Sequence, residues 1–475
     1  MKKKRFINFP DFIAKIYPHD KEKTGFRGSS IKRELTRSVT FQVTDACNLA
    51  CTYCYQTNKG TRVMSFETAK MFVDLLLSGD KGFHDYVNPE VSEGIVIEFI
   101  GGEPFLQIEL IDQIVDYLRR RMIVEHHPWQ EKFCISICSN GVLYRDEKVQ
   151  QFLQKNYDCI SFSVTVDGNQ ELHDACRVFP DGTGSYSLAE DAAMDWMHRG
   201  YYMGSKITIA PENLQYLFTA FRHFVELGYE EINANCVYEA NWTVEQAGEL
   251  YKQMKLMADF LLSSDEYARI YCSLFQRIVG KPMDDTDIQN WCGGTGAMLA
   301  CDPDGNLFPC IRYMESSLNG EREPFCIGDI HSGLMLLPEH VQRVKCLDCV
   351  TRRTQSTDEC FYCPIASGCS WCSAWNYQVF GTADKRCIDI CCMHKARSLA
   401  NAYFWNKYDE KYGRDEDEEA VNLWLPEQAA VAIIGAEEYS SLRELVLSCG
   451  GFVNKELIKT NGESEKELIA KVTKK

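Results

Sequence analysis

The chain has 475 residues, of which 45% are hydrophobic and 25% are charged, and this composition excludes a mainly disordered protein. No apolar run is long enough to span a membrane, and charged positions interrupt the segment behind the basic start, so we expect neither a membrane contact nor a signal peptide. The net charge of −17 argues against a nucleic-acid partner, because contacts to phosphates need Lys and Arg. We therefore expect a cytoplasmic protein.

Between residues 38 and 262, apolar runs of strand length alternate with patterns of helical period. The predicted strands lie at 38–43, 95–100, 133–138, 160–166, 206–210 and 231–237. The predicted helices lie at 66–77, 108–121, 147–154, 188–198, 214–227 and 244–262, with Ser65 as the N-cap of the first. Six such units with nearly continuous apolar strands indicate an α/β fold, in which a buried parallel sheet closes into a partial (β/α)6 barrel.

Beyond residue 262 the periodicity weakens, and composition divides the rest of the chain. We interpret residues 263–290 as a bridging region and residues 291–410 as a cysteine-rich domain that ends in a helical pattern. Residues 411–475 are an acidic linker with a small C-terminal module. Residues 1–37 form an N-terminal extension before the first strand.

Cysteine is the unusual component, with 23 residues, of which 13 lie between Cys292 and Cys392. Because a cytoplasmic chain is kept reduced, so many cysteines indicate metal or redox chemistry rather than a disulfide scaffold. Five others fall at apolar positions of predicted strands and helices and are expected to be small core residues. They are Cys134, Cys138, Cys159, Cys236 and Cys272.

The first predicted strand runs into a C-x3-C-x2-C cluster formed by Cys47, Cys51 and Cys54. Ligands of such folds sit at the carboxyl ends of the strands, which is where this loop lies. Three thiolates can hold three irons of a cubane [4Fe–4S] cluster and leave the fourth iron open for a substrate. Structural zinc is the alternative, although it would need a distant fourth ligand.

Cys47, Cys51, Tyr53 and Cys54 match the C-x3-C-x-(aromatic)-C signature, and residues 38–262 resemble the radical S-adenosylmethionine (SAM) enzymes. The resemblance implies that the three cysteines bind a [4Fe–4S] cluster whose open iron is chelated by the amino and carboxylate groups of SAM. It also implies that Tyr53 lies beside the adenine. No catalytic residue is assigned beyond the cluster and SAM.

Residues at the ends of the next strands resemble the family's other SAM contacts. Gly101-Gly102-Glu103-Pro104 resembles its GGEP motif, in which glycines allow close backbone approach and a carboxylate can accept a hydrogen bond from an ammonium group. The remaining expected SAM contacts are Ser139, Asn140, Thr165, Asp167 and Arg177. Asn-Gly and Asp-Gly also make ordinary turns, and a surface salt bridge is the alternative for Arg177.

The cysteine-rich block contains a G-x4-C stretch, Gly305 to Cys310, and the run Cys360-x2-Cys363-x5-Cys369-x2-Cys372. In these motifs it resembles a SPASM domain, the auxiliary Fe–S module of peptide-modifying radical SAM enzymes, and the resemblance implies two further [4Fe–4S] clusters, three in all. We assign Cys292, Cys310 and Cys372 to auxiliary cluster one, whose fourth ligand stays unassigned. Auxiliary cluster two is assigned to Cys360, Cys363, Cys369 and Cys391. Further candidate ligands are Cys301, Cys346, Cys349, Cys387 and Cys392. Zinc knuckles are the alternative for this block.

The resemblances imply an enzyme that receives an electron from a flavodoxin- or ferredoxin-type donor and cleaves SAM to form a 5′-deoxyadenosyl radical. We expect thioether formation, from a cysteine sulfur to a carbon, in a ribosomally made, Cys-containing precursor peptide. An anaerobic sulfatase-maturing enzyme, which forms formylglycine, is the alternative. That family is expected to carry an aspartate after the cysteine that Cys310 matches, where this chain has Ile311. A zinc-stabilised, non-catalytic interaction protein is the third hypothesis.

Overall fold

A computed structural model describes residues 38–87, 89, 92, 94–286, 292–320 and 322–454. The N-terminal extension at 1–37 and the part of the C-terminal module at 455–475 lie outside the described residues. All six predicted barrel strands are confirmed. They are β1 (Ser38–Thr44), β2 (Ile95–Gly101), β3 (Phe133–Ser139), β4 (Ile160–Val164), β5 (Ser205–Ile209) and β6 (Glu231–Cys236).

The six predicted helices are also present, and their apolar faces pack against the strands. They are α2 (Phe66–Ser78), α3 (Ile108–Val124), α4 (Glu147–Lys155), α6 (Tyr186–His198), α7 (Leu217–Glu226) and α8 (Val244–Leu262). Ser65 caps α2 as expected, since its side chain accepts a hydrogen bond from the backbone N–H of Thr68. The short α5 (Gln170–Cys176), capped by Asn169, was not predicted. The 3-10 turns of this part are η3 (Pro104–Gln107), η4 (Pro211–Tyr216) and η5 (Tyr267–Arg269).

The strands form two sheets. β1 to β4 pair in parallel and in order, while β5 and β6 form a separate parallel sheet with the short β7 (Tyr271–Cys272) from the bridging region. Between described residues, no ladder joins β4 to β5. The predicted α/β fold is confirmed, with its parallel barrel strands interrupted at this one point.

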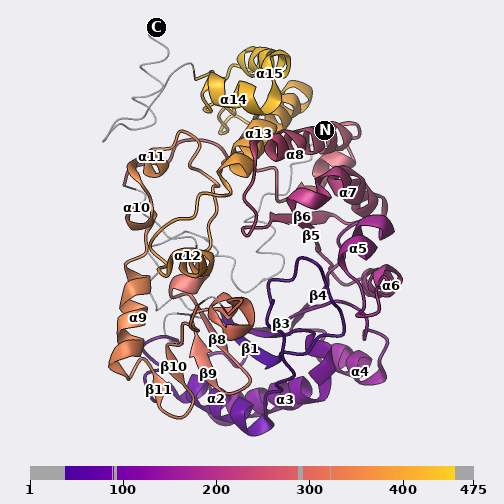
Figure 1. Cartoon of the computed structure of the whole chain (residues 1–475). Coiled ribbons are helices and arrows are strands. Elements are labelled where there is room, and N and C mark those ends of the chain that lie inside the picture. The colour runs from indigo at the N-terminus through magenta and orange to yellow at the C-terminus, as the bar shows by residue number, and fades with distance from the viewer. Residues whose placement is uncertain are drawn as a thin grey trace.

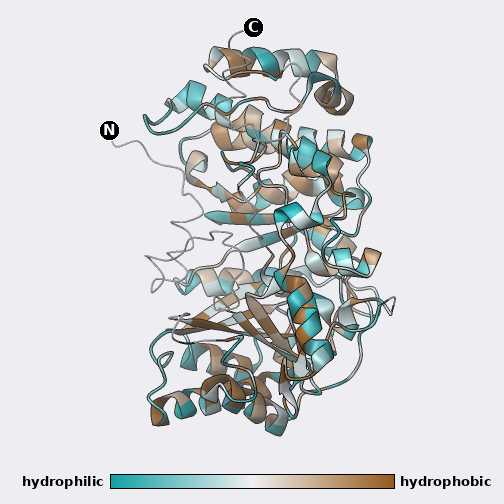
Figure 2. Ribbon diagram, turned by 90° about the vertical axis from the view of Figure 1, so that its left-hand side faces the viewer, coloured by the Kyte–Doolittle hydropathy of each residue, from teal (hydrophilic) through white to brown (hydrophobic). Residues whose placement is uncertain are grey.

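The first sheet continues into the cysteine-rich block, which the sequence did not predict. β8 (Met298–Cys301) pairs in parallel with β1 and brings Cys301 opposite Phe41. The strands β9 (Asn306–Phe308), β10 (Gly328–Asp329) and β11 (Gly333–Leu334) then extend the sheet antiparallel. Figure 2 shows the strands in the lower part of the molecule, where this sheet lies, largely in brown, the colour of hydrophobic residues.

Alternate residues of β3 lie on opposite faces of the sheet. Ile135 and Ile137 are fully buried in the core, whereas Ser136 is partly buried and Cys138 is exposed. The expectation that Cys138 is a core residue is therefore wrong. Of the other four cysteines in that group, Cys272 is buried and the rest are partly buried.

The cysteine-rich block closes the molecule opposite the barrel, as Figure 1 shows. Its helices are α9 (Pro338–Asp348), α10 (Arg352–Gln355), α11 (Asp358–Phe361), α12 (Ser373–Phe380) and α13 (Cys391–Tyr412), and its turns are η6 (Gly293–Thr295), η7 (Ile311–Tyr313) and η8 (Glu315–Ser317). The long helix α13 packs along α8 of the barrel. The block is therefore joined to the barrel at two places, through β8 and through α13.

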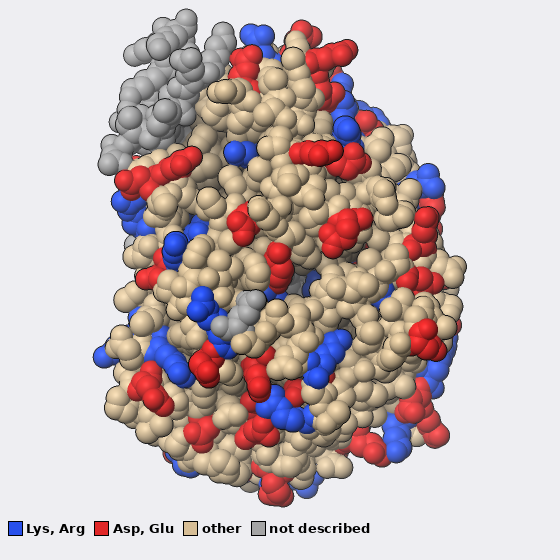
Figure 3. All heavy atoms as spheres, viewed as in Figure 1, with Lys and Arg blue, Asp and Glu red and all other residues tan. Residues whose placement is uncertain are grey.

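The described part of the C-terminal module contains α14 (Glu427–Ile434) and α15 (Ala436–Ser448), which pack against α8 and α13. Acidic and basic side chains are interspersed over the face in Figure 3, without a patch of one sign. Of the helices that the structure describes, none is both long and apolar enough to cross a membrane.

Candidate functional site

The Cys47–Cys54 loop follows β1 and is held by the ends of the two neighbouring strands. The backbone N–H of Glu103, after β2, donates to the carbonyl of Ala46 at 2.9 Å. The side-chain amide of Asn140, after β3, donates to the amide oxygen of Asn48 at 2.7 Å. The loop therefore lies at the carboxyl edge of the sheet, where the sequence placed it.

The three thiols of the loop are partly buried. Burial raises the pKa of Cys47 and of Cys51, while the nearby cations Lys59 and Arg177 act in the opposite direction. One Arg177 guanidinium nitrogen lies 3.8 Å from the Cys51 sulfur. A positive charge at this distance favours the thiolate, which is the form that binds metal.

Gly101 and Gly102 lie against the cysteine loop, with no room for a side chain. A Cβ on Gly102 would come within 2.4 Å of the Ala46 carbonyl oxygen and 2.7 Å of the Cys47 Cβ. A Cβ on Gly101 would lie 2.9 Å from the Thr44 carbonyl oxygen. The glycines are therefore needed for the close approach of two backbone segments.

Glu103 is 1% exposed, and protein donors engage both of its carboxylate oxygens. One oxygen accepts hydrogen bonds from the Ser139 hydroxyl at 2.7 Å and from the Phe105 N–H at 3.1 Å, and the other accepts from the Asn140 N–H at 2.8 Å. Burial raises its pKa, against the lowering effect of these bonds. In this arrangement the carboxylate ties the end of β2 to the end of β3.

Tyr53, Asp167 and Arg177 form one contact group beside the cysteine loop. The Arg177 Nε donates to the Asp167 carboxylate at 2.9 Å and contacts the Tyr53 hydroxyl at 2.7 Å, and that hydroxyl donates to the same carboxylate oxygen. The Arg177 guanidinium also lies 5.5 Å from the centre of the Tyr53 ring. Because the side chains of Asp167 and Arg177 are only 1% and 12% exposed, the alternative of a surface salt bridge does not apply.

Thr165 directly follows the end of β4, two residues before Asp167. Its backbone N–H donates to the Ser139 carbonyl at 2.9 Å, and its hydroxyl lies 3.2 Å from the sulfur of Cys138. All nine predicted SAM contacts thus gather at the ends of β1 to β4 or on the α5 segment that follows. The Thr52 N–H, which donates to the Cys176 carbonyl at 2.9 Å, fixes that segment to the cysteine loop.

These residues fit a polar ligand and a thiolate-bound cluster. The second carboxylate oxygen of Asp167 is buried and has no hydrogen-bond partner within the described part of the chain, so a donor is wanted there. Among the described side chains, no three of Cys, His, Asp and Glu converge closely enough to hold a single metal ion. A cubane binds each thiolate to a different iron, so its ligands stand further apart.

Cys292, Cys310 and Cys372, which we call group one, come from three distant segments and lie together. The thiols of Cys310 and Cys292 interact electrostatically with that of Cys372, and burial, together with this neighbour, raises the pKa of Cys292 to about 11. The Ser373 hydroxyl lies 3.1 Å from the Cys292 sulfur. These are the three residues that the sequence grouped for auxiliary cluster one.

Cys360, Cys363, Cys369 and Cys391, which we call group two, also lie together. Burial raises the pKa of Cys363 to about 12, with further increases from its three partners. The partly buried Arg386 donates to the Cys369 sulfur at 2.9 Å and so places a cation beside the group. The sequence analysis did not single out this arginine.

The five further candidate cysteines lie outside groups one and two, and two of them are neighbours at the end of one helix. Cys301 is buried in the sheet, with Cys326 as its cysteine neighbour, and Cys346 and Cys349 are exposed at the end of α9. The Cys387 thiol contacts the Asp389 carboxylate at 3.0 Å. Cys392 follows Cys391 and packs on the core.

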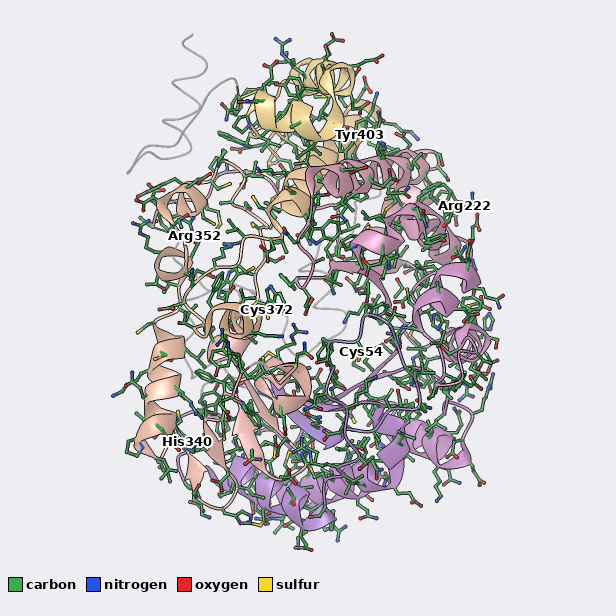
Figure 4. The ribbon with its side chains drawn as sticks, viewed as in Figure 1. Cys54, Arg222, His340, Arg352, Cys372 and Tyr403 are labelled. Atoms are coloured by element: carbon green, nitrogen blue, oxygen red, sulfur yellow. The ribbon has the colours of Figure 1, made fainter. Side chains whose placement is uncertain are left out.

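Tyr238, after β6, lies between the two groups. Its phenol interacts with the Ser370 hydroxyl and lies near Cys292 and Cys372 of group one and Cys369 of group two, and burial raises its pKa to about 12. Figure 4 shows that Cys372 and Cys54 face the middle of the molecule from opposite sides. The barrel loop and group one are thus presented to the same central region.

Comparison with known proteins identifies the barrel. Residues 41–189 match the family model of the radical SAM superfamily. The chain contains a radical SAM domain. It is 30% identical over 199 residues to an uncharacterised protein of Methanocaldococcus jannaschii, and the match covers 42% of this chain and 61% of that one.

Two further relatives of this radical SAM protein have names that state an activity. It is 21% identical to the serine-type anaerobic sulfatase-maturating enzyme of Bacteroides thetaiotaomicron, over 62% of this chain and 72% of that enzyme. It is 22% identical to a mycofactocin maturase of Mycolicibacterium smegmatis, over 57% and 63%. The chain therefore spans roughly three fifths to three quarters of the length of these curated relatives.

Solved structures share the fold beyond the barrel. The structure of anSMEcpe with bound AdoMet and the Cp18Cys peptide matches with a TM-score of 0.54 and 18% identity, over 77% of this chain and 96% of that one. Streptococcus suis SuiB bound to the precursor peptide SuiA matches with a TM-score of 0.50 and 11% identity, over 74% and 75%. At these identities the likeness establishes the fold, and it includes part of the cysteine-rich block of this chain.

Proposed function

We propose that this protein is a radical SAM peptide maturase that forms thioether bonds, from a cysteine sulfur to a carbon, in a Cys-containing precursor peptide. The observation that carries the proposal is the pairing of two thiol sets across one central region. One is the Cys47–Cys54 loop of the barrel, and the other is group one in the cysteine-rich block. Relatives that include sulfatase and mycofactocin maturases support a peptide as the substrate.

Cys47, Cys51 and Cys54 would hold the first [4Fe–4S] cluster, and groups one and two would hold the two auxiliary clusters. With SAM bound, the first cluster supplies the reductive cleavage that yields a 5′-deoxyadenosyl radical, with the electron coming from a flavodoxin- or ferredoxin-type donor. Arg177 supplies a fixed cation beside Cys51. Asp167 has one buried oxygen that lacks a partner among the described residues and would accept a hydrogen bond from bound SAM.

The other predicted SAM contacts shape the site. Gly101 and Gly102 let the end of β2 approach the backbone that leads into the cysteine loop, and Tyr53 presents a ring that Arg177 orients. Ser139 and Asn140 act through the Glu103 carboxylate, which holds the ends of β2 and β3 at a fixed separation. The Thr165 hydroxyl beside Cys138 faces the same edge of the sheet.

Each thioether removes two hydrogens from the peptide. One leaves the carbon as a hydrogen atom and ends in 5′-deoxyadenosine, and the thiol hydrogen leaves as a proton. Joining the sulfur to the carbon would release one electron, and an iron cluster held by Cys292, Cys310 and Cys372 would supply the acceptor for it. A low-polarity surrounding suits such a redox site, and the group one cysteines pack in a buried apolar cluster.

Formylglycine formation is the second candidate, because the sulfatase-maturating relatives favour it. That reaction needs a base near the substrate, and this chain has Ile311 after Cys310, where we expect an aspartate in that family. Formylglycine formation by this chain would therefore need a carboxylate from another element as the base. Glu239, which pairs with Arg312 close to this point, is such a group.

The test is to incubate the reduced, iron-loaded enzyme and SAM without oxygen with the Cys-containing peptide encoded beside this chain. Thioether formation lowers the peptide mass by two hydrogens and consumes one iodoacetamide-reactive thiol for each bond. Formylglycine formation from cysteine removes sulfur instead. A product that is still alkylated at every cysteine would refute the proposal, and the Cys47/Cys51/Cys54→Ala variant is the matched inactive control.

A further inference from the structure

Arg312 connects the two thiol sets and has no role in the function proposed above. It lies on η7, two residues after Cys310, and its backbone N–H donates to the Cys310 sulfur. Its guanidinium carbon lies 5.0 Å from the centre of the Tyr55 ring, and Tyr55 directly follows Cys54. A single side chain thus reaches from group one to the cysteine loop of the barrel.

Glu239 and Tyr55 fix the orientation of this guanidinium. Its Nη2 donates to the Glu239 carboxylate, which lies just after β6 at the edge of the barrel. Tyr55 covers one face of the guanidinium plane, in the geometry of a cation–π contact. A guanidinium held by one carboxylate and one ring keeps a defined direction, which a lysine ammonium would not.

Donors of the guanidinium remain available to a ligand. An arginine carries five N–H donors, and in the described part of the chain only Nη2 of Arg312 meets an acceptor. The Arg312 side chain is 18% exposed, Glu239 is 37% exposed and Tyr55 is 36% exposed, so the cluster is partly accessible to solvent. An anion that reached the guanidinium there would form charge-assisted hydrogen bonds in a partly desolvated place.

The surroundings define where such an anion would lie. The Tyr55 phenol lies near Glu98 and Cys138, both on the barrel strands, and Arg312 lies near Cys372 of group one. Glu98 is hydrogen-bonded by Thr40 at 2.6 Å. Arg312 therefore lies between the barrel strands and group one, the region in which the proposed function places the peptide substrate.

We propose that Arg312, oriented by Tyr55 and Glu239, is a positioning residue that binds an anionic group of the substrate peptide between the two thiol sets. The anion is a cysteine thiolate or a side-chain carboxylate, since both pair with a guanidinium. The inference rests on the proposed function for the identity of the ligand as a peptide. To the proposed function it adds a preference for anionic substrate peptides and names Arg312 as the residue that sets this preference.

Binding of displayed peptides tests this without turnover. A library of mRNA-displayed 12-residue peptides with random sequence and one fixed central cysteine is selected on immobilised, iron-loaded protein with SAM and without oxygen. A second library has serine in place of the cysteine. A thiolate ligand predicts enrichment from the cysteine library alone, and a carboxylate ligand predicts Asp or Glu at a constant offset in both libraries.

The variants give effects of opposite sign. Arg312→Gln should lower the enrichment of anionic peptides at least five-fold, and Arg312→Lys should retain part of it. Glu239→Gln removes the competing carboxylate but keeps the hydrogen-bonding shape, so it should raise the enrichment about two-fold or more. A residue with only a structural role would make all three variants change in the same direction. Iron content and SAM cleavage are measured in parallel on each variant.

Two results would overturn the inference. One is equal enrichment by the unaltered protein and Arg312→Gln, and the other is no enrichment by the unaltered protein. If Arg312→Gln loses iron, the enrichment of anionic peptides by Arg312→Lys and by Glu239→Gln is used in its place. Enrichment equal to that of the unaltered protein in both variants would overturn the inference. A protein that enriches anionic peptides but forms neither 5′-deoxyadenosine nor a thioether would refute the proposed function and leave this inference standing.

Discussion

The two thiol-bearing regions differ in how they are built and in what surrounds them. Cys47, Cys51 and Cys54 lie within eight consecutive residues, and charged groups of the barrel stand around them. The group one cysteines come from segments up to 80 residues apart and pack with Phe308, Met314 and Trp371 in a buried apolar cluster. A polar, partly open site suits a charged cosubstrate, whereas an apolar one excludes water and tunes a redox centre.

The largest expected effect separates the regions by their iron. Replacing Cys47, Cys51 and Cys54 by Ala should remove about four irons per chain and lower 5′-deoxyadenosine formation at least about 100-fold, while iron in the block remains. Replacing the three group one cysteines should remove a different set of about four irons. Iron quantification, Mössbauer spectroscopy and chromatography of the nucleoside provide the readouts.

The exposed pair on α9 supplies the control for this experiment. A Cys346→Ser/Cys349→Ser variant changes two thiols that lie outside both groups, so it should keep all of its iron. Undiminished deoxyadenosine formation in the barrel triple variant would contradict the assignment of that loop. If the barrel triple variant contains zinc and no iron, the cysteine-rich block is a zinc-stabilised structural module instead.

The next effect tests the close approach of the barrel's glycine pair to its cysteine loop. Gly102→Ala places a Cβ 2.4 Å from the Ala46 carbonyl oxygen, so the loop must shift, and we expect loss of most of the barrel iron with the block iron retained. The control is Gly204→Ala, whose Cβ would meet nothing closer than the far end of Tyr202 at 3.2 Å. Equal iron content in both variants would show that the glycine pair does not position the loop.

The contrast between the regions also explains which features the sequence revealed. The barrel loop is contiguous, and its strands and helices follow local periodicity, so all six strands were predicted within a few residues. The pairing of β8 with β1 was missed, because a four-residue strand that pairs across some 260 residues of chain leaves no local signal. The exposure of Cys138 was missed because an apolar-looking strand does not show which of its faces lacks a covering layer.

Side-chain partnerships were the least predictable part of the site. The motif located Glu103, yet its engagement by Ser139, Asn140 and Phe105 depends on how two strand ends meet. Arg312 and Glu239 come from turns 73 residues apart, and neither belongs to a repeated spacing. Such contacts are set by tertiary packing, which a single sequence does not encode in any short pattern.

A third effect concerns the buried ion pair of the barrel. Arg177→Gln leaves the Asp167 carboxylate buried without its cation, and it should cost about 3–5 kcal/mol of folding free energy along with SAM affinity. Urea denaturation followed by tryptophan fluorescence measures the loss. The double variant Arg177→Gln/Asp167→Asn should recover part of the stability but not SAM binding.

An exposed arginine serves as the reference for that measurement. Arg222, on the outer surface of α7, pairs with Glu226 at 3.2 Å, and both side chains are about half exposed (Figure 4). Arg222→Gln should change the stability by less than about 1 kcal/mol, since exposed pairs contribute little. If both arginine variants cost the same, the Arg177–Asp167 pair is not a buried pair in solution.

The smallest effect is a pH dependence on the barrel side, through His173 on α5. This histidine is fully buried, and burial lowers its pKa from 6.5 to about 4. Its Nδ1 accepts a hydrogen bond from the Asp167 N–H at 3.3 Å, and its Nε2 lies 3.0 Å from the Ser185 hydroxyl, so the neutral ring is the form that fits. A proton on Nδ1 would face the Asp167 N–H and find no acceptor.

Because the folded-state pKa lies below that of the unfolded chain, the neutral histidine contributes its full stability above pH 6.5. That contribution falls as the pH drops from 6.5 towards 4, by up to about 3 kcal/mol, since the unfolded chain takes up the proton first. His173→Gln should therefore flatten the stability profile between pH 6.5 and 4. The exposed His198 on α6 provides the matched substitution, His198→Gln, which should leave the profile unchanged. If the free energy of unfolding depends on pH with the same slope in the unaltered protein and in His173→Gln, then the acid sensitivity of the barrel arises from groups other than His173.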